Sequence, residues 1–173
     1  FNVNGKITGF DVSPDGKKLA FSSRGELFVS DVKGKFVRQL KTGSSGRITE
    51  VVWLKDNKTI LFLKTADGWY NLFKIRADVT EQAQQLTTDK ANNRNLGLNS
   101  DRSKLVYLSG TRDVRVMDLA DFKSKTIVSD ELWGFYNSQP SFSPDDKYIL
   151  FEGRRNFEPD IIIHNLQTGQ TTN

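Results

Sequence analysis

The sequence contains no cysteine and only one histidine among its 173 residues. Without cysteine the chain can form neither a disulfide bond nor a thiolate metal site, although a disulfide-free protein can occupy either side of a membrane. One histidine cannot supply the pair of imidazole ligands typical of many zinc sites. We therefore expect no metal and no cofactor.

Long apolar runs and blocks of like charge are also missing. No run approaches the roughly 18 residues needed to span a bilayer, and residues 1–5 have neither the charged nor the apolar region of a signal peptide. The 25 basic and 21 acidic residues are interspersed, without a basic stripe that alternates with aromatic residues. We expect neither membrane insertion nor nucleic-acid binding. Because the sequence does not begin with methionine, we expect a processed product or a piece of a longer polypeptide.

The sequence lacks the combination of residues that nucleophilic catalysis requires. A serine nucleophile needs a base such as histidine and often lies on a Gly-x-Ser-x-Gly elbow, which does not occur here. The single histidine, His164, lies in an apolar strand-like run, at the position that Ser30, Ile75 and Met117 occupy in the repeats described below. We expect His164 to be a packed residue, and we predict no catalytic residue in this chain.

What the sequence does contain is a repeat. A turn with a central aspartate recurs at Asp15, Asp56, Asp101 and Asp145, with spacings of 41, 45 and 44 residues. Two apolar, strand-like runs follow each turn, and a more polar run closes the unit. Proline, aspartate and glycine explain such a turn by their backbone preferences, without a bound calcium ion. Repeats of about 40 to 45 residues with four short strands are typical of β-propeller blades.

We therefore predict an all-β fold, with residues 1–173 forming one β-propeller segment of about four four-stranded antiparallel blades. The inner strands are apolar on both faces, as expected for sheets that pack between neighbouring blades. The weak final run leaves open whether these blades belong to a ring of six or seven. The predicted blades span residues 7–47, 48–92, 93–135 and 136–173.

Two longer loops, at residues 65–70 and 153–159, carry aromatic and arginine residues. Such side chains on exposed loops are typical of binding surfaces, whereas the alternative is that the aromatic rings pack under their own blade edges. The predicted contact residues for a peptide or partner are Trp69, Tyr70, Arg154, Arg155 and Phe157. The aromatic residues expected in the core at blade junctions are Trp53, Trp133 and Phe135.

The run at residues 13–21, followed by that at residues 25–31, resembles the WD-like blades of tricorn-type and TolB-type propellers. The stretches at 7–16, 130–135 and 155–158 look like the propeller of bacterial tricorn-like serine peptidases, and this resemblance covers essentially the whole chain. It implies a propeller segment of a large periplasmic or secreted peptidase, although a cytoplasmic location stays open. No position here matches the catalytic residues of that family.

The resemblance implies that the segment guides or docks peptide substrate, or organises neighbouring domains, while the catalytic residues lie in other domains. The alternative is a stand-alone TolB-like module that binds another folded protein. The expected partners are accordingly a peptide or unfolded polypeptide, or neighbouring domains of the same protein. Exposed blade surfaces also leave self-association open.

Overall fold

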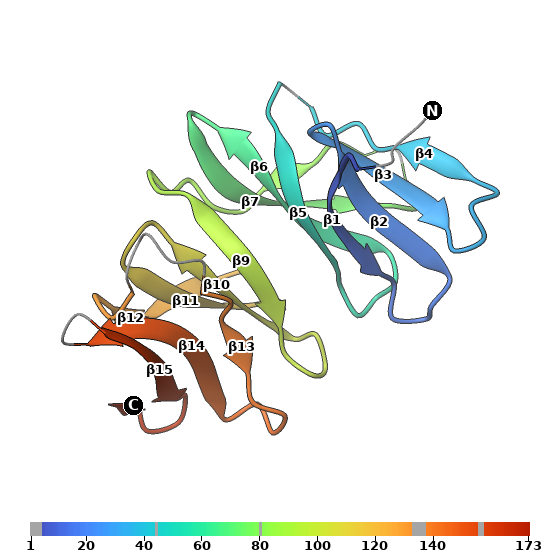
Figure 1. Ribbon diagram of the computed structural model, residues 1–173. Helices are drawn as coiled ribbons and strands as arrows, with labels where there is room; N and C mark the ends of the chain where they lie inside the picture. The colour runs from blue at the N-terminus through green and yellow to red at the C-terminus, as the bar shows by residue number, and fades with distance from the viewer. Residues whose placement is uncertain (1–4, 44, 80, 133–137, 156–157) are drawn as a thin grey trace. The chain divides into compact units, whose positions relative to one another are not determined.

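The computed structural model describes residues 5–43, 45–79, 81–132, 138–155 and 158–173, with the backbone alone at 154 and 155. Within these ranges the regular secondary structure consists of β-strands alone, and the sixteen strands form four sheets of four strands each. The predicted all-β blade architecture is confirmed (Figure 1). The chain divides into two compact units, residues 1–92 and 93–173. No helix long and apolar enough to cross a membrane occurs in the described ranges.

The first unit contains two blades, each an antiparallel sheet whose strands follow chain order. Blade 1 consists of β1 (Ile7–Val12), β2 (Lys18–Ser23), β3 (Glu26–Asp31) and β4 (Val37–Gln39). Blade 2 consists of β5 (Ile48–Trp53), β6 (Thr59–Ala66), β7 (Trp69–Arg76) and β8 (Gln84–Gln85).

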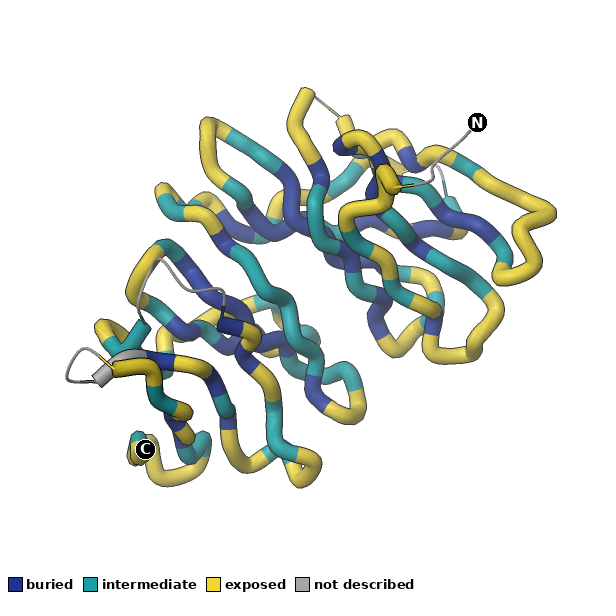
Figure 2. The backbone as a smooth tube through the Cα atoms, in the orientation of Figure 1, coloured by how far each residue is buried: buried dark blue, intermediate teal, exposed yellow. Residues whose placement is uncertain are grey.

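The second unit repeats this arrangement, and in both units the central strands carry most of the buried residues (Figure 2). Blade 3 consists of β9 (Asn93–Leu98), β10 (Lys104–Ser109), β11 (Asp113–Asp118) and β12 (Ser124–Ser129). Blade 4 consists of β13 (Ser141–Phe142), β14 (Tyr148–Arg155), β15 (Glu158–Asn165) and β16 (Thr171–Thr172).

Each blade has two faces because successive side chains of a strand point to opposite sides of the sheet. We call the face of blade 1 that carries Ala20 the trailing face. The same name is used in the other blades for the face that carries the equivalent residues. The opposite one, which carries Phe21, is the leading face. In the first unit the trailing face of blade 1 and the leading face of blade 2 form one core cluster. Its central members are Ala20, Leu27 and Val29 from blade 1, and Ile60, Phe62, Phe73 and Ile75 from blade 2.

The core of the second unit follows the same rule. Val106 and Leu108 on the trailing face of blade 3 belong to one cluster with Ile149, Phe151 and Ile162 on the leading face of blade 4. These residues are buried, with exposed fractions of 0 to 3%. The continuous apolar runs of β6 and β10 are buried on both faces of the sheet, since burial on one face alone would produce alternation.

The recurring aspartate turn has one conformation in all four blades. The turn has four residues, of which the aspartate is the third. The fourth residue has a positive φ of 55 to 70°, which glycine adopts freely and asparagine and aspartate tolerate. In blade 1 the Ser13 hydroxyl donates to Asp15 and accepts from the Lys18 amide, which closes the turn. The hydroxyl bond from Ser13 is the main cause that holds the pKa of Asp15 below its usual value. The residues at the fourth position are Gly16, Asn57, Arg102 and Asp146.

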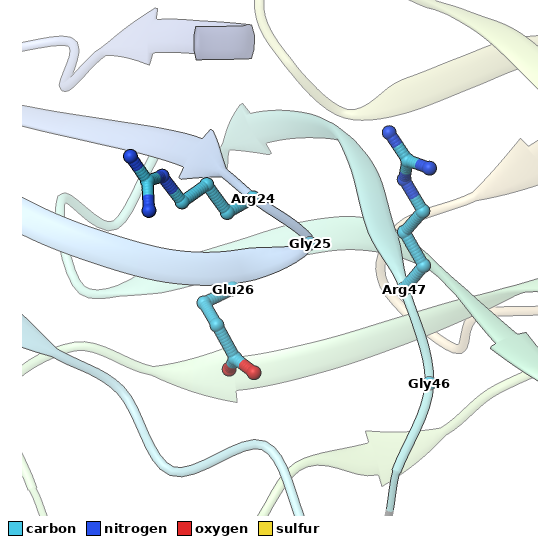
Figure 3. Close-up of a pocket in the computed structure, with 5 residues that line it drawn as sticks. All are labelled: Arg24, Gly25, Glu26, Gly46 and Arg47. Carbon is cyan, nitrogen blue, oxygen red and sulfur yellow. The ribbon is translucent and has the colours of Figure 1, made fainter. Parts of the chain in front are cut away.

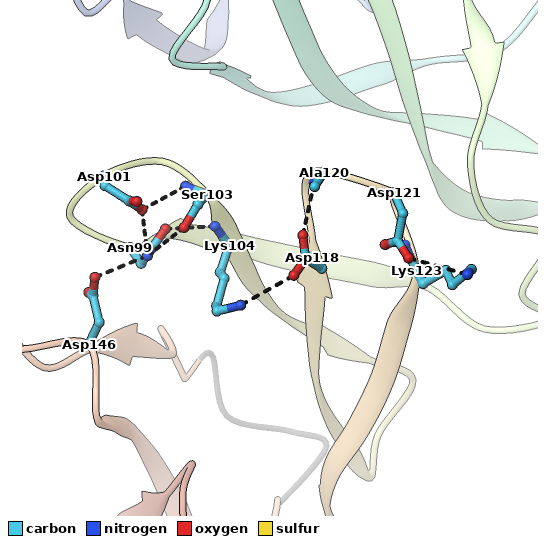
Figure 4. Close-up of polar contacts among 9 residues, drawn as sticks. All are labelled: Asn99, Asp101, Ser103, Lys104, Asp118, Ala120, Asp121, Lys123 and Asp146. Carbon is cyan, nitrogen blue, oxygen red and sulfur yellow. Dashed lines mark hydrogen bonds and ion pairs between the residues drawn. The ribbon is translucent and has the colours of Figure 1, made fainter.

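The same turns connect the blades within each unit. In the first unit the Asn57 side chain accepts a hydrogen bond of 2.8 Å from the backbone amide of Asp15. In the second unit the Asp146 carboxylate accepts from the Asn99 side chain (Figure 4). It also accepts from the amide and the hydroxyl of Ser100. The fourth residue of one turn thus bonds to the preceding turn, so the repeat motif is also a contact between blades.

Candidate functional site

The first unit has an open pocket of about 460 Å³ between the β2–β3 turn and the segment that leads into β5. The β2–β3 hairpin turns through Arg24 and Gly25, both at positive φ, as a two-residue type I′ turn requires. Figure 3 shows the Arg24 and Arg47 side chains on opposite sides of this turn, and the Glu26 side chain extends in a different direction from both. The pocket is lined by Arg24, Gly25, Glu26, Gly46 and Arg47.

Backbone hydrogen bonds hold this pocket together across the two blades. The Gly25 carbonyl accepts from the Ile48 amide at 2.9 Å, and the Arg47 carbonyl accepts from the Thr65 amide at 3.0 Å. Arg47 is therefore positioned between the β2–β3 turn of blade 1 and the end of β6 in blade 2. Its backbone is fixed while its side chain is exposed, which suits a residue that binds a ligand.

Gly46 occupies a position where no side chain fits. A Cβ atom there would lie 2.4 Å from the Thr65 carbonyl oxygen and 2.8 Å from Cε of Lys64. The close approach lets the buried Lys64 side chain extend beneath the loop, where its ammonium group donates to the Thr42 carbonyl at 2.9 Å. Burial lowers the pKa of Lys64, and the nearby Glu26 opposes this shift. The buried Lys64 side chain thus lies against Gly46, one of the residues that line the pocket.

Two of the residues predicted from sequence lie at the same end of this unit. Trp69 begins β7 directly after the Asp67-Gly68 turn, and its exposed fraction is 39%. Tyr70 is half-buried and pairs with Thr65, whose amide bonds to Arg47. Arg47 and Tyr70 are therefore separated by two strand spacings, or about 10 Å. We call Arg24, Glu26, Arg47, Trp69 and Tyr70 the loop edge.

A buried polar network supports the β7 side of the loop edge. The side-chain oxygen Oδ1 of Asn71 accepts from the Thr87 hydroxyl at 2.7 Å and from the Asp89 amide at 2.8 Å. The Tyr70 amide donates to the Asn92 side chain at 3.0 Å. These bonds attach the segment after β8 to β7, so the strand that carries Trp69 has a fixed support.

The other predicted contact residues belong to the second unit. The backbones of Arg154 and Arg155 form the end of β14, paired with Pro159 and Glu158. Phe157 lies outside the described residues, and its prediction stays a prediction. Of the aromatic residues expected in the core, Trp53 is fully buried, whereas Trp133 and Phe135 also lie outside the described residues.

Sequence reasoning did not single out the arginine pocket. Arg24 and Arg47 are 23 positions apart in the sequence, and only the packing of blade 1 on blade 2 brings their segments together. The one local signal was Arg24-Gly25 between two strand-like runs, because a glycine there indicates a two-residue hairpin turn. That signal predicts a turn and says nothing of Arg47.

His164 lies on β15 with an exposed fraction of 5%. Its position is equivalent to that of Ser30, Ile75 and Met117, since each pairs with the second residue of its blade's second strand. The His164 Nδ1 lies 2.9 Å from the Thr171 hydroxyl. Burial, and to a lesser extent the charge of Lys125, lowers the pKa of His164 below its ordinary value of 6.5.

This lowered pKa predicts a pH dependence of stability. Below pH 6.5 the unfolded chain binds a proton that the folded His164 resists, so the unfolding free energy falls as the pH decreases toward the folded pKa. Above pH 6.5 His164 is neutral in both the folded and the unfolded chain, so its titration no longer lowers the unfolding free energy. We expect His164→Gln to flatten this part of the profile, as measured by urea unfolding across the pH range. Hydrogen bonds from Ser13 and Ser143 hold the pKa values of Asp15 and Asp145 below the ordinary 3.8, so the acid response of these carboxylates at lower pH should be unchanged and provides an internal control. An identical profile for the variant near pH 6 would contradict this assignment.

Over the described part of the chain, no group of three or more histidine, cysteine, aspartate or glutamate residues is placed to hold a metal ion. The repeated four-stranded antiparallel blades, stacked face to face in each unit, define the chain as a β-propeller protein. The TolB beta propeller domain family matches residues 2–172. The chain therefore belongs to this family.

Solved structures share the fold of this chain. A putative TolB from Agrobacterium tumefaciens has a TM-score of 0.71 at 18% identity, over 95% of this chain and 60% of that one. TolB from Acinetobacter baumannii has a TM-score of 0.68 at 18% identity, over 99% of this chain and 43% of that one. The tricorn protease has a TM-score of 0.74 at 19% identity, over 96% of this chain and 16% of that one. No curated protein matches the sequence.

Proposed function

We propose that this chain is a non-catalytic interaction module that binds peptide or unfolded polypeptide at the loop edge of its first unit. The observation that carries the proposal is the exposed Trp69 at the start of a fixed strand, whose next residue, Tyr70, lies about 10 Å from Arg47 of the arginine pocket. Membership of the TolB beta propeller domain family and the absence of a recognisable nucleophile–base pair in the sequence support an interaction role over a catalytic one.

The residues of the loop edge indicate which peptides it would bind. The guanidinium groups of Arg24 and Arg47 favour carboxylates, to which arginine can donate two parallel hydrogen bonds. Trp69 offers a rigid apolar surface that suits an aromatic or aliphatic side chain. The preferred ligand is therefore an extended peptide with aspartate or glutamate close to an aromatic residue.

We expect Trp69→Ala and Arg47→Ala each to weaken the binding of such a peptide by about tenfold, because central aromatic and arginine residues dominate interface energies. Fluorescence anisotropy of a labelled acidic-aromatic peptide measures the effect directly. Both residues are exposed, so neither change should unfold the blade. Higher salt should weaken the contribution of Arg47 more than that of Trp69.

The matched control is Phe36→Ala, because Phe36 is an exposed aromatic residue of blade 1 in the turn between β3 and β4. This variant should bind the peptide as the unaltered chain does. A basic-aromatic peptide of the same length should bind more weakly. Equal affinities for all three variants, or a preference for the basic peptide, would count against the loop edge as the binding site.

A second candidate is a more specific form of the same role, in which the segment docks or guides substrate within a tricorn-like peptidase. The resemblance of residues 130–135 and 155–158 to tricorn-like propellers favours it. This candidate includes the periplasmic or secreted location that the resemblance implies. It predicts that an antibody against this segment detects a product on the order of 100 kDa, the size of a large multidomain chain. A product near 20 kDa would favour the stand-alone TolB-like module.

A further inference from the structure

Lys64 of β6 is a buried cation at a position where the other blades have small residues. Its exposed fraction is 2%, although lysine is among the residues least often buried. The residues at the same distance from the turn aspartate in blades 1, 3 and 4 are Ser23, Ser109 and Gly153. The blade architecture therefore does not require a long or charged side chain here. Because burying a cation costs free energy, Lys64 needs an explanation particular to blade 2.

The Lys64 side chain reaches the connection between β4 and β5 (residues 40–47). Its ammonium group donates to the Thr42 carbonyl at 2.9 Å, and its Nζ lies 5.5 Å from the centre of the Phe73 ring. Its aliphatic stem lies against Gly46, where a Cβ atom would be 2.8 Å from Cε and 3.2 Å from Cγ. The side chain therefore meets the connection at two points, Thr42 and Gly46.

This connection ends at Arg47, which lines the arginine pocket. Backbone hydrogen bonds of 2.9 Å hold both of its ends to blade 1, from the Leu40 amide at the start and from the Ile48 amide directly after Arg47. Lys64 binds the connection between these ends, at Thr42. The course of the chain up to Arg47 is therefore fixed by one long side chain of β6 in addition to the bonds at its ends.

The cross-strand partner of Lys64 has the same relation to the segment after β8. Asn71 pairs with Lys64 across β6 and β7, so the two side chains lie on the same face of blade 2. The Asn71 side chain bonds to the Thr87 hydroxyl and to the backbone amide and carbonyl of Asp89. One buried polar pair thus holds two connecting segments next to the loop edge.

We propose that Lys64 is a positioning residue of the loop edge, which fixes the connection between β4 and β5 and thereby positions Arg47 to bind a carboxylate of the peptide. This inference rests on the proposed peptide-binding function. A cation inside a strand breaks the usual rule of burial, and such departures are typical of functional sites. Lys64 accordingly contributes to the affinity for an acidic side chain without a gain in the stability of the blade.

Lys64→Met separates stability from binding, because methionine has nearly the length of lysine and no charge. We expect the urea midpoint of unfolding to stay the same or to rise, since an apolar residue of similar volume often replaces a buried charge without loss. Affinity for the acidic-aromatic peptide should fall about tenfold, whereas that for the same peptide with asparagine in place of aspartate should be nearly unchanged. A lower midpoint, equal losses for the two peptides, or no loss for the acidic one would each overturn the proposal.

A double-mutant cycle tests whether Lys64 acts through Arg47. In a chain that already carries Arg47→Ala, Lys64→Met should weaken binding of the acidic peptide no further, because the group that it positions is gone. Additive losses in the double variant would mean that Lys64 affects the peptide independently of Arg47, which would refute a positioning role.

Chemical rescue isolates the ammonium group. Because the sequence contains no cysteine, Lys64→Cys introduces a single thiol. Alkylation of the unfolded chain with 2-bromoethylamine, followed by refolding, rebuilds a side chain of lysine length with a terminal ammonium group. Alkylation with 1-bromopropane gives the same length with a methyl group. The first adduct should bind the acidic peptide as the unaltered chain does, and the second about tenfold more weakly. Equal affinities of the two adducts would contradict the role of the ammonium group.

Hydrogen exchange in the free chain tests the positioning without a peptide. The Ile48 and Thr65 amides donate on either side of the end of the connection, to the Gly25 and Arg47 carbonyls, and both should exchange about tenfold faster in Lys64→Met. The Leu54 amide, bonded in the aspartate turn at the other end of blade 2, is the control and should not change. Unchanged exchange at Ile48 and Thr65 would overturn the proposal. If the unaltered chain bound no peptide, the proposed function would fail, and the exchange rates would still show whether Lys64 fixes Arg47.

Discussion

Phe62→Ala is expected to lower the unfolding free energy of the first unit by about 3–5 kcal/mol, the usual cost of truncating a buried phenylalanine. Phe62 has no exposed surface and stacks on Phe73 within the cluster that joins blade 1 to blade 2. Its loss leaves a cavity between two sheets whose hydrogen bonds limit their collapse. Urea denaturation followed by circular dichroism measures the change.

Phe36→Ala is the control for this prediction, because Phe36 is 53% exposed and belongs to no core cluster among the described residues. Its cost should stay within about 0.5 kcal/mol. Equal losses in the two variants would mean that blade packing does not carry the stability of this unit.

Gly153→Ala is expected to cost about 1–3 kcal/mol, the usual range for overpacking a close contact. A Cβ atom at Gly153 would lie 2.6 Å from both the Glu131 carbonyl oxygen and Cγ1 of Ile162. The carbonyl belongs to the segment that leads toward blade 4 and cannot move without shifting backbone. Calorimetric unfolding of the whole chain measures the loss.

The neighbouring residue provides the control for Gly153. Glu152 points to the opposite face of β14 and is exposed, so Glu152→Ala should change stability by no more than about 0.5 kcal/mol. If Gly153→Ala were as stable as Glu152→Ala, the close approach of β14 to the Glu131 segment would be wrong.

The fold was predictable because a single short-range pattern recurs. The aspartate turns and the apolar runs after them define β2, β6, β10 and β14, and all four sheets contain the predicted four strands. Strand-like runs such as residues 161–163 indicated sheets covered on both sides. That inference holds for the blade contacts within each unit, whereas the Ile161 side chain itself is exposed.

The candidate site was less predictable from sequence. Trp69 follows an Asp-Gly turn, so its place at a hairpin end could be predicted, and the structure places it exposed at such an end. The pocket formed by Arg24 and Arg47 depends on how blade 1 packs on blade 2, which no local pattern encodes. Lys64 is the clearest example, since a lysine in a strand is ordinarily expected at the surface but here is 2% exposed.

The most direct test of the proposed interaction role is a titration of the isotopically labelled chain with the acidic-aromatic peptide, followed by nuclear magnetic resonance. We expect saturable shifts of the Gly25 and Arg47 amides and of the Trp69 indole, with much smaller changes in residues 93–173. Saturable shifts confined to residues 93–173, or no shift at the loop edge at peptide concentrations that saturate binding in anisotropy, would contradict the account.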